Sequence, residues 1–308
     1  MEETIERGFD VGADPNLEIS NGAGAIHVRG EDTSTIQVQV VKRGSEEEIA
    51  NTLLEFSQNG KQVVVAARGQ SMTCSVEFDV TVPLGCAVQA NSTSGEIRIV
   101  GIRQGVRANN ASGEIVVEDI EGGCTVDSAS GSVRIRGLGG ALTLRTASGD
   151  VEVLDSRLPG FDLNGASGSF VIETPLVASG TYAARTASGS LTLRVPPETG
   201  ASVILRTMSG GIHSDLPAEV ASEGFGRWRG RINGGGALVE MYSASGDLNV
   251  ERGRSAVVSG TVRTSDTSSS PGPHGAEEPM TSDTTAVLKA LERGDLTLDD
   301  AMRRLNDL

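Results

Sequence analysis

The chain has 308 residues, of which 26 are Lys or Arg and 41 are Asp or Glu, so its formal net charge is −15 at pH 7. This acidity argues against binding to nucleic-acid phosphates and against electrostatic docking on anionic lipid, because both need a positive surface. Hydrophobic residues make up 37% of the chain, which is too much for wholesale disorder, and there are 40 glycines.

The first twelve residues, MEETIERGFDVG, are acidic and contain no apolar segment of the kind a secretory signal needs. No apolar run in the sequence is long enough to cross a bilayer. We therefore expect no membrane span and a cytoplasmic location, with surface display left open if the sequence is a trimmed form. The three cysteines, Cys74, Cys86 and Cys124, are odd in number and form no CxxC pair, which favours neither a disulfide framework nor a zinc site.

Residues 1–85 are predicted to form a β-rich part that caps the open end of the structure that follows. Segments such as TIQVQVV and SVEFDVTV alternate apolar and polar residues, as strands do. Between them, Ser45 to Gln58 predicts one amphipathic helix (about 45–58). Ser45 would be its N-cap, Glu48 the partner in a capping box, and Ile49, Leu53 and Leu54 its apolar stripe.

Residues 86–252 repeat one unit eight times, as in NNASGEIVV, DSASGSVRI and RTASGDVEV. Each copy has a Ser–Gly pair where the chain must turn, since glycine tolerates positive φ and a serine hydroxyl can bond nearby backbone. The predicted turn pairs are Ser94 and Gly95, Ser112 and Gly113, Ser130 and Gly131, Ser148 and Gly149, Ser167 and Gly168, Ser188 and Gly189, Ser209 and Gly210, and Ser245 and Gly246. A degenerate earlier copy, NGAGAIHV, surrounds Gly24.

Apolar residues recur in fixed columns around each turn glycine, at the seventh and fifth positions before it and the second and fourth after it. Ile115 and Val117 illustrate the columns that follow the glycine. Each unit therefore predicts two short strands that cannot bury their apolar edge alone, whereas stacked units make the columns continuous. The expected fold is all-β, a β-solenoid of about eight two-stranded coils; the alternative is a β-sandwich with frequent hairpins. Small residues beside the turn are expected to let successive corners approach closely, namely Ala111, Ala129, Ala147, Ala166, Ala187 and Ala244.

Three ordered features carry a family resemblance: the T/A-x-SG-[DE]-[ILV] units, the VPLG step from Val82 to Gly85, and INGGGALVEMYSASGDLNV near the end of the repeats. With them the sequence resembles the bacterial putative-adhesin family, a domain of unknown function, over about residues 5–252. The resemblance implies a β-solenoid or β-helix and brings no established catalytic residues.

Ala221 to Gly236 interrupts the repeat and holds the only tryptophan, Trp228, among Arg227, Arg229 and Arg231. The favoured interpretation is a hairpin that packs Trp228 over the sheet. The alternative is a ligand or partner loop with cation–π character.

After the repeats, residues 253–282 are rich in Ser, Thr, Pro and Gly and predict a flexible linker. Residues 283–308 then predict a helical hairpin, closed in the middle by Gly294. Such a short segment cannot bury a core of its own, so it is expected to pack on a protein partner or to mediate self-association. It also resembles short helical hairpins attached to domains of this family. The residues proposed for the interaction are Val287, Leu288, Leu291, Leu298, Met302 and Leu305.

A search for chemistry predicts no catalytic, cofactor-binding or metal-binding residue. His27, His213 and His274 show no ligand spacing and are interpreted as solvent-facing. The neighbouring acids Glu96 and Glu114 could share a cation, but solvated turn acids are favoured.

One further column is basic: Arg145, Arg185 and Arg206 stand four residues before their turn glycines. They could line an anion-binding stripe, but pairing with surface acids is favoured in so acidic a chain. The sequence thus favours a non-enzymatic β-solenoid scaffold or adhesin-like interaction protein with the hairpin as its interaction module. One alternative is a polysaccharide-binding or polysaccharide-active β-helix, against which the scarce aromatics weigh. Another, which rests on family association alone, is a cytoplasmic component of an envelope-stress or regulatory system.

Overall fold

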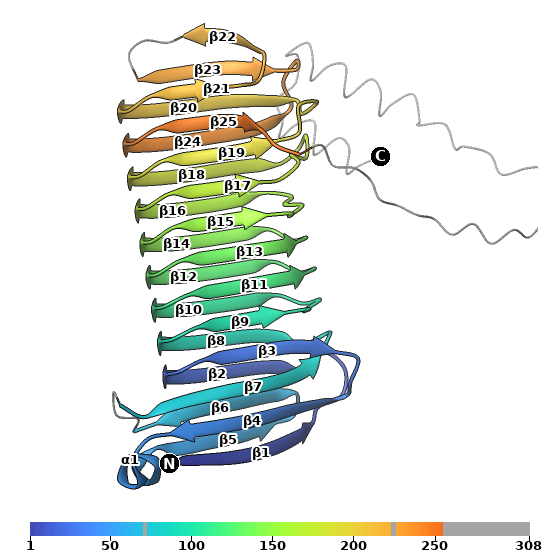
Figure 1. Ribbon diagram of the computed structural model, residues 1–308. Coiled ribbons are helices and arrows are strands. Elements are labelled where there is room, and N and C mark those ends of the chain that lie inside the picture. The colour runs from blue at the N-terminus through green and yellow to red at the C-terminus, as the bar shows by residue number, and fades with distance from the viewer. Residues whose placement is uncertain (70–72, 223–225, 255–308) are drawn as a thin grey trace, which may run out of the picture. The chain divides into compact units, whose positions relative to one another are not determined.

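The computed structural model describes residues 1–69, 73–222 and 226–254. These residues form two long sheets that face each other across a narrow core (Figure 1). The fold prediction of an all-β solenoid is confirmed. The predicted linker from residue 255 onward and the predicted hairpin, residues 283–308, lie outside the described residues, so both stay predictions.

The first sheet, within the described residues, has twelve strands. In spatial order they are β1 (Glu2–Asp10), β4 (Thr35–Arg43), β7 (Ser75–Pro83), β3 (Ile26–Glu31), β9 (Ile97–Val100), β11 (Ile115–Ile120), β13 (Val133–Leu138), β15 (Val151–Leu154), β17 (Phe170–Glu173), β19 (Leu191–Val195), β25 (Leu248–Arg252) and β21 (Ile212–Ser214).

The second sheet has thirteen strands in the same described ranges. In spatial order they are β5 (Leu53–Asn59), β6 (Gln62–Arg68), β2 (Asn16–Ala23), β8 (Ala87–Ser94), β10 (Val106–Ser112), β12 (Cys124–Ser130), β14 (Leu142–Ser148), β16 (Phe161–Ser167), β18 (Thr181–Ser188), β24 (Ala237–Ser245), β20 (Ala201–Ser209), β23 (Arg227–Ile232) and β22 (Ala218–Ser222).

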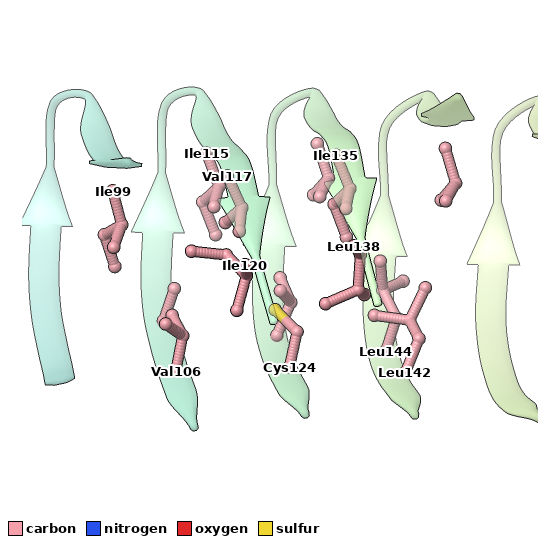
Figure 2. Packing of buried hydrophobic residues seen from close by; sticks show 14 of the residues in the cluster. Ile99, Val106, Ile115, Val117, Ile120, Cys124, Ile135, Leu138, Leu142 and Leu144 are labelled. Atoms are coloured by element: carbon pink, nitrogen blue, oxygen red, sulfur yellow. The ribbon is translucent and has the colours of Figure 1, made fainter. Parts of the chain in front are cut away.

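Each coil contributes one strand to each sheet, and successive coils pair in parallel with their repeats in register. Ile115 of β11, for example, lies opposite Ile97 of β9 and Val133 of β13. All four predicted apolar columns point inward and make one continuous core (Figure 2), except at the edge strand β21, where Ile212 and Ser214 are half-buried. The period-two alternation that predicted the strands is therefore the division between core and solvent.

The turn glycines hold the coils together at one corner. Gly131 has φ = 125°, and a Cβ added to it would lie 1.9 Å from the carbonyl oxygen of Gly113 in the preceding coil. The Gly113 amide donates to the carbonyl of Ser130 at 3.1 Å, and the same bond recurs between other coils. Of the eight predicted turn glycines, Gly189 alone lacks a φ in the positive range. It is the glycines that meet across successive corners, while the alanines beside them lie exposed or half-buried.

A column of small polar residues lies buried behind each turn, three positions before the glycine. Three of its side chains donate to the carbonyls of turn glycines: Asn110 to Gly95 at 2.8 Å, Thr207 to Gly246 at 3.1 Å and Ser243 to Gly189 at 3.1 Å. Alternation alone did not single this column out, although its regular Ser, Asn and Thr content is visible in the sequence. Its buried members are Asn21, Ser92, Asn110, Ser128, Thr146, Thr186, Thr207 and Ser243.

Gly165 is the exception in this polar column, and Phe170 explains it. A Cβ at Gly165 would lie 2.1 Å from the Phe170 ring, so the ring occupies the space that a Ser, Asn or Thr side chain fills in other coils. We expect Gly165→Thr to lower the free energy of unfolding by about 3 kcal/mol through overpacking. Gly165→Thr combined with Phe170→Val should recover most of that loss, because both changes restore the usual pair. Urea unfolding of the two single variants and the double variant measures this, and additive losses would contradict it.

The three cysteines are buried. Burial raises the pKa of the Cys86 and Cys124 thiols from 9.0 to about 12. Because the unfolded chain releases these protons first, their contribution to stability is present below pH 9 and is lost as the pH rises toward 12. We expect the native protein to resist thiol reagents until it is unfolded. The alkaline loss of stability should flatten in the Cys86→Val, Cys124→Val double variant; unchanged alkaline unfolding in that variant would contradict the assignment.

The coils do not stack in sequence order at the C-terminal end of the repeats. Strand β24 pairs in parallel with β18 on one side and β20 on the other, and β25 likewise lies between β19 and β21. The last repeat is thus inserted between the two that precede it (Figure 1). The hairpin β22–β23 covers the edge of β20 that faces away from β24. The chain then returns to form β24 between β18 and β20.

The N-terminal part supplies two more coils and a cap. Strands β2 and β3 pair in parallel with β8 and β9, which confirms the degenerate repeat around Gly24. Strands β6 and β7 pair in parallel with β2 and β3 and form a further coil. With both, the described residues form ten parallel coils: β6–β7, β2–β3, β8–β9, β10–β11, β12–β13, β14–β15, β16–β17, β18–β19, β24–β25 and β20–β21. Beyond β6–β7, the antiparallel strands β1, β4 and β5 close the stack.

The predicted helix over 45–58 is wrong in its extent. The helix α1 covers only Glu46–Asn51, and β5 begins at Leu53. Its predicted capping box is present, since Ser45 and Glu48 bond each other's backbone amides. From Leu53 the sequence alternates with period two, and Leu54 and Phe56 pack against the core from a strand while Leu53 is 63% exposed.

Candidate functional site

A groove runs across the outer face of the second sheet, over five neighbouring strands from β12 to β24. It has a volume of about 870 Å³. Its floor consists of the alanines two residues before the turn glycines, whose small side chains leave room above the sheet. One side is formed by longer side chains four residues before the glycines. The lining alanines are Ala129, Ala147, Ala166, Ala187 and Ala244, and the lining side residues are Asp127, Arg145, Asn164, Arg185 and Tyr242.

The insertion of β24 makes this groove continuous. In sequence order, Met208 would interrupt the alanine floor between Ala187 and Ala244. In the fold, Ala244 lies on β24 beside Ala187 on β18, and Met208 on β20 follows at the end, with 73% of its surface exposed. The Tyr242 hydroxyl donates to the Met208 sulfur at 3.6 Å. In the aligned repeats, Tyr242 occupies the column of Arg185 and Met208 the column of Ala187. Only the stacking order shows that both lie at the same end of the groove.

The arginine column forms part of the side of the groove. Arg145 Nη1 lies 3.5 Å from Asp127 Oδ1, and Arg185 Nη1 lies 3.3 Å from Asp162 Oδ1. These two arginines pair with surface acids, as the sequence favoured. Arg206 makes no ion pair with a described residue, and its register partner across the antiparallel β20–β23 pair is Arg227.

The outer face of the first sheet carries alternating charges. Glu114 pairs with Arg134 of the next coil. Two other acids that follow turn glycines bond the adjacent coil: Asp150 accepts from the Ser169 amide at 2.9 Å, and Asp247 accepts from the Gly211 amide at 2.7 Å. Within the described residues no three His, Cys, Asp or Glu side chains gather where they could hold a metal ion.

The two described histidines each face one aspartate at the surface. His27 Nδ1 lies 3.2 Å from Asp79 Oδ1, and His213 Nε2 lies 2.8 Å from Asp215 Oδ1. His27 borders a polar hollow of about 660 Å³ on the first sheet near the N-terminal cap. His274 lies outside the described residues, as do all six predicted interaction residues of the hairpin.

Trp228 is half-buried against the core, and Gly230 leaves the space that its indole fills. Its strand β23 forms the predicted hairpin with β22. The cation–π contact found in the described part of the chain joins Arg7 to the Phe56 ring at 5.9 Å, far from Trp228 in sequence. The interpretation of this segment as a packing hairpin is therefore confirmed.

The fold and its surface define a class: a two-sheet β-solenoid whose Ser–Gly corners stack in register. The chain belongs to the family described as Toastrack DUF4097, which matches residues 15–251. No curated protein matches the sequence. Across the described residues, no helix is both long and apolar enough to cross a membrane.

Several solved structures are similar at low identity. A putative adhesin from Bacteroides fragilis has 12% identity and a TM-score of 0.45, over 81% of this chain and 97% of that one. A putative adhesin from Parabacteroides distasonis has 9% identity and a TM-score of 0.41, over 80% and 97%. A putative lipid binding protein from the same organism has 11% identity and a TM-score of 0.36, over 80% and 96%.

Proposed function

We propose that this protein is a non-enzymatic, adhesin-like scaffold that binds partners along the outer face of its second sheet. The observation that carries the proposal is the groove of about 870 Å³, which crosses five coils of a regular sheet. A wide, shallow surface on a rigid repeat array suits the binding of an extended partner, as in other solenoids. The outer face of the first sheet instead carries ion pairs, among them Arg98 with Glu118 and Arg134 with Glu114.

The C-terminal hairpin, residues 283–308, is the second part of the proposal. Its apolar positions follow helical spacing in a segment too short for a core, so it serves as a protein-interaction or oligomerisation module. In this arrangement the solenoid presents the groove, and the hairpin joins the scaffold to a protein partner or to a second copy.

The full-length protein and its Leu291→Asp and Leu305→Asp variants test the hairpin's role. Asn306→Asp is the matched control, because it adds the same charge off the apolar stripe. We expect light scattering to show a lower oligomeric mass, or affinity capture to lose the partner, in the two leucine variants only. Equal mass and equal capture in all four proteins would contradict the interaction role. Release of soluble sugars from a polysaccharide panel by the native protein would contradict the non-enzymatic assignment.

A further inference from the structure

Four polar side chains on the side of the groove continue into Arg206 just beyond its end, and together they form a row on five adjacent strands. Each is the register partner of the next across β14, β16, β18, β24 and β20. All five lie on the outer face of the sheet, and their order along the stack is Arg145, Asn164, Arg185, Tyr242 and Arg206. We call these five residues the arginine row.

The arginines of this row stand on every second strand. Neighbouring strands are about 4.8 Å apart, so the three guanidinium groups recur at about 9.6 Å along the axis of the stack. This interval depends on the inserted strand: with β18 next to β20, Arg185 and Arg206 would be direct neighbours. A regular interval of two strands is close to the length of one disaccharide in an extended glycan.

The end of the row carries charge that the protein itself does not neutralise. Arg206 and Arg227 lie directly opposite each other, and neither forms an ion pair with a described residue. Like charges in such cross-strand positions are destabilising. The chain has a net charge of −15, yet it places these two cations opposite each other. An anion bound between them would relieve their repulsion. The acids of this face include Asp162 and Glu240 in the column beside the row, and Asp127, which precedes Arg145 in the row's own column and pairs with it.

Tyr242 adds an aromatic surface between two of the cations. It is one of only two tyrosines in the chain, and 38% of its surface is exposed. Its hydroxyl is bonded to Met208, which fixes the ring beside the alanine floor. Sugar rings pack their C–H faces on apolar and aromatic groups, and their hydroxyls and carboxylates bond to Arg and Asn side chains. The alanine floor with Tyr242 provides the first kind of surface, and the arginines and Asn164 of the row provide the second.

From these observations we propose that the groove binds an extended acidic glycan with one carboxylate in each disaccharide, lying along the axis of the stack with its carboxylates on the arginine row. This inference rests on the proposed scaffold function and names its ligand class. An extended acidic peptide fits less well, because the strands' backbone groups are already bonded to each other and its own would stay unpaired. An acyl chain fits less well because the groove is shallow and would leave most of the chain in water.

Binding of hyaluronan oligosaccharides and of unsulfated chondroitin to the full-length protein, measured by calorimetry, tests this proposal. Affinity should rise with oligosaccharide length until it spans Arg145 to Arg206, about 19 Å, and then level off. Each of Arg145→Ala, Arg185→Ala and Arg206→Ala should weaken binding roughly threefold to tenfold, and the triple variant should abolish it. Tyr242→Ala should weaken binding while Tyr242→Phe largely preserves it.

The matched control is a triple variant on the outer face of the first sheet, Arg98→Ala with Arg134→Ala and Arg136→Ala. It removes the same charge from equally exposed positions and should leave affinity within about twofold. Absence of binding to both glycans, equal loss in the two triple variants, or equally tight binding of polyglutamate or phosphatidylserine vesicles would overturn the inference. The assembly measurements on the hairpin variants do not depend on any glycan, so the scaffold function can stand when this inference fails.

Discussion

Gly131→Ala adds only one methyl group, yet it is expected to be among the most destabilising substitutions in this protein. The added Cβ would lie 1.9 Å from the Gly113 carbonyl oxygen, and the backbone at φ = 125° is one that L-residues rarely adopt. Neither coil can yield without breaking the bond from the Gly113 amide to Ser130. We expect the free energy of unfolding to fall by about 3–5 kcal/mol, measured by urea denaturation.

Gly60→Ala is the control for this prediction. Gly60 has φ = 59°, so it carries a conformational cost, but a Cβ there would meet no atom within 4 Å. Its substitution should cost about 1 kcal/mol. Equal losses at Gly60 and Gly131 would mean that the conformation alone matters and that the coils do not approach as closely as described.

Ile115→Asp should unfold the protein or destabilise it by more than about 4 kcal/mol. Ile115 lies in the core (Figure 2). It is fully buried, with Ile97 and Val133 as its register partners, so the carboxylate would have neither water nor a partner. The conservative Ile115→Val should cost only about 1 kcal/mol, because it removes one methyl group from the same site.

Val116→Asp is the control on the same strand. Val116 points to the opposite face, where its register partners are Arg98 and Arg134 and where neighbouring side chains leave it 7% exposed. A carboxylate there loses this cover but gains cationic neighbours, so we expect a loss of about 1–2 kcal/mol by the same unfolding measurement, well below the loss at Ile115. Similar destabilisation at the two adjacent positions would contradict the assignment of inward and outward columns.

Repetition made the local structure predictable. Every turn glycine recurs with the same apolar spacing, so the period-two strands, the shared core and the degenerate copy at Gly24 all followed from the pattern. The helix prediction failed after Asn51 because Leu53 and Leu54 continue a helical stripe from Ile49, while Leu54 and Phe56 also alternate as a strand does. Pairing with β6 decided between them, and that is a tertiary contact.

The stacking order of the coils could not be predicted from the sequence. The repeat around Gly246 matches its predecessors as well as any other, and nothing local marks it for insertion between the coils of Gly189 and Gly210. The groove depends on that order, since it brings Ala244 beside Ala187 and Tyr242 beside Arg185. The aligned columns therefore predict which residue types line the candidate site, whereas which of these residues are neighbours depends on the stacking order.

Disulfide formation between paired cysteines tests the stacking order most directly. Arg185 and Tyr242 are register partners on adjacent strands, about 4.8 Å apart, whereas Arg185 and Arg206 are two strands apart at about 9.6 Å. The account predicts that the Arg185→Cys, Tyr242→Cys variant forms a cross-link on mild oxidation and that the Arg185→Cys, Arg206→Cys variant does not, because a disulfide cannot bridge Cα atoms more than about 7 Å apart. A cross-link in the second variant and none in the first would place the coils in sequence order and contradict the account.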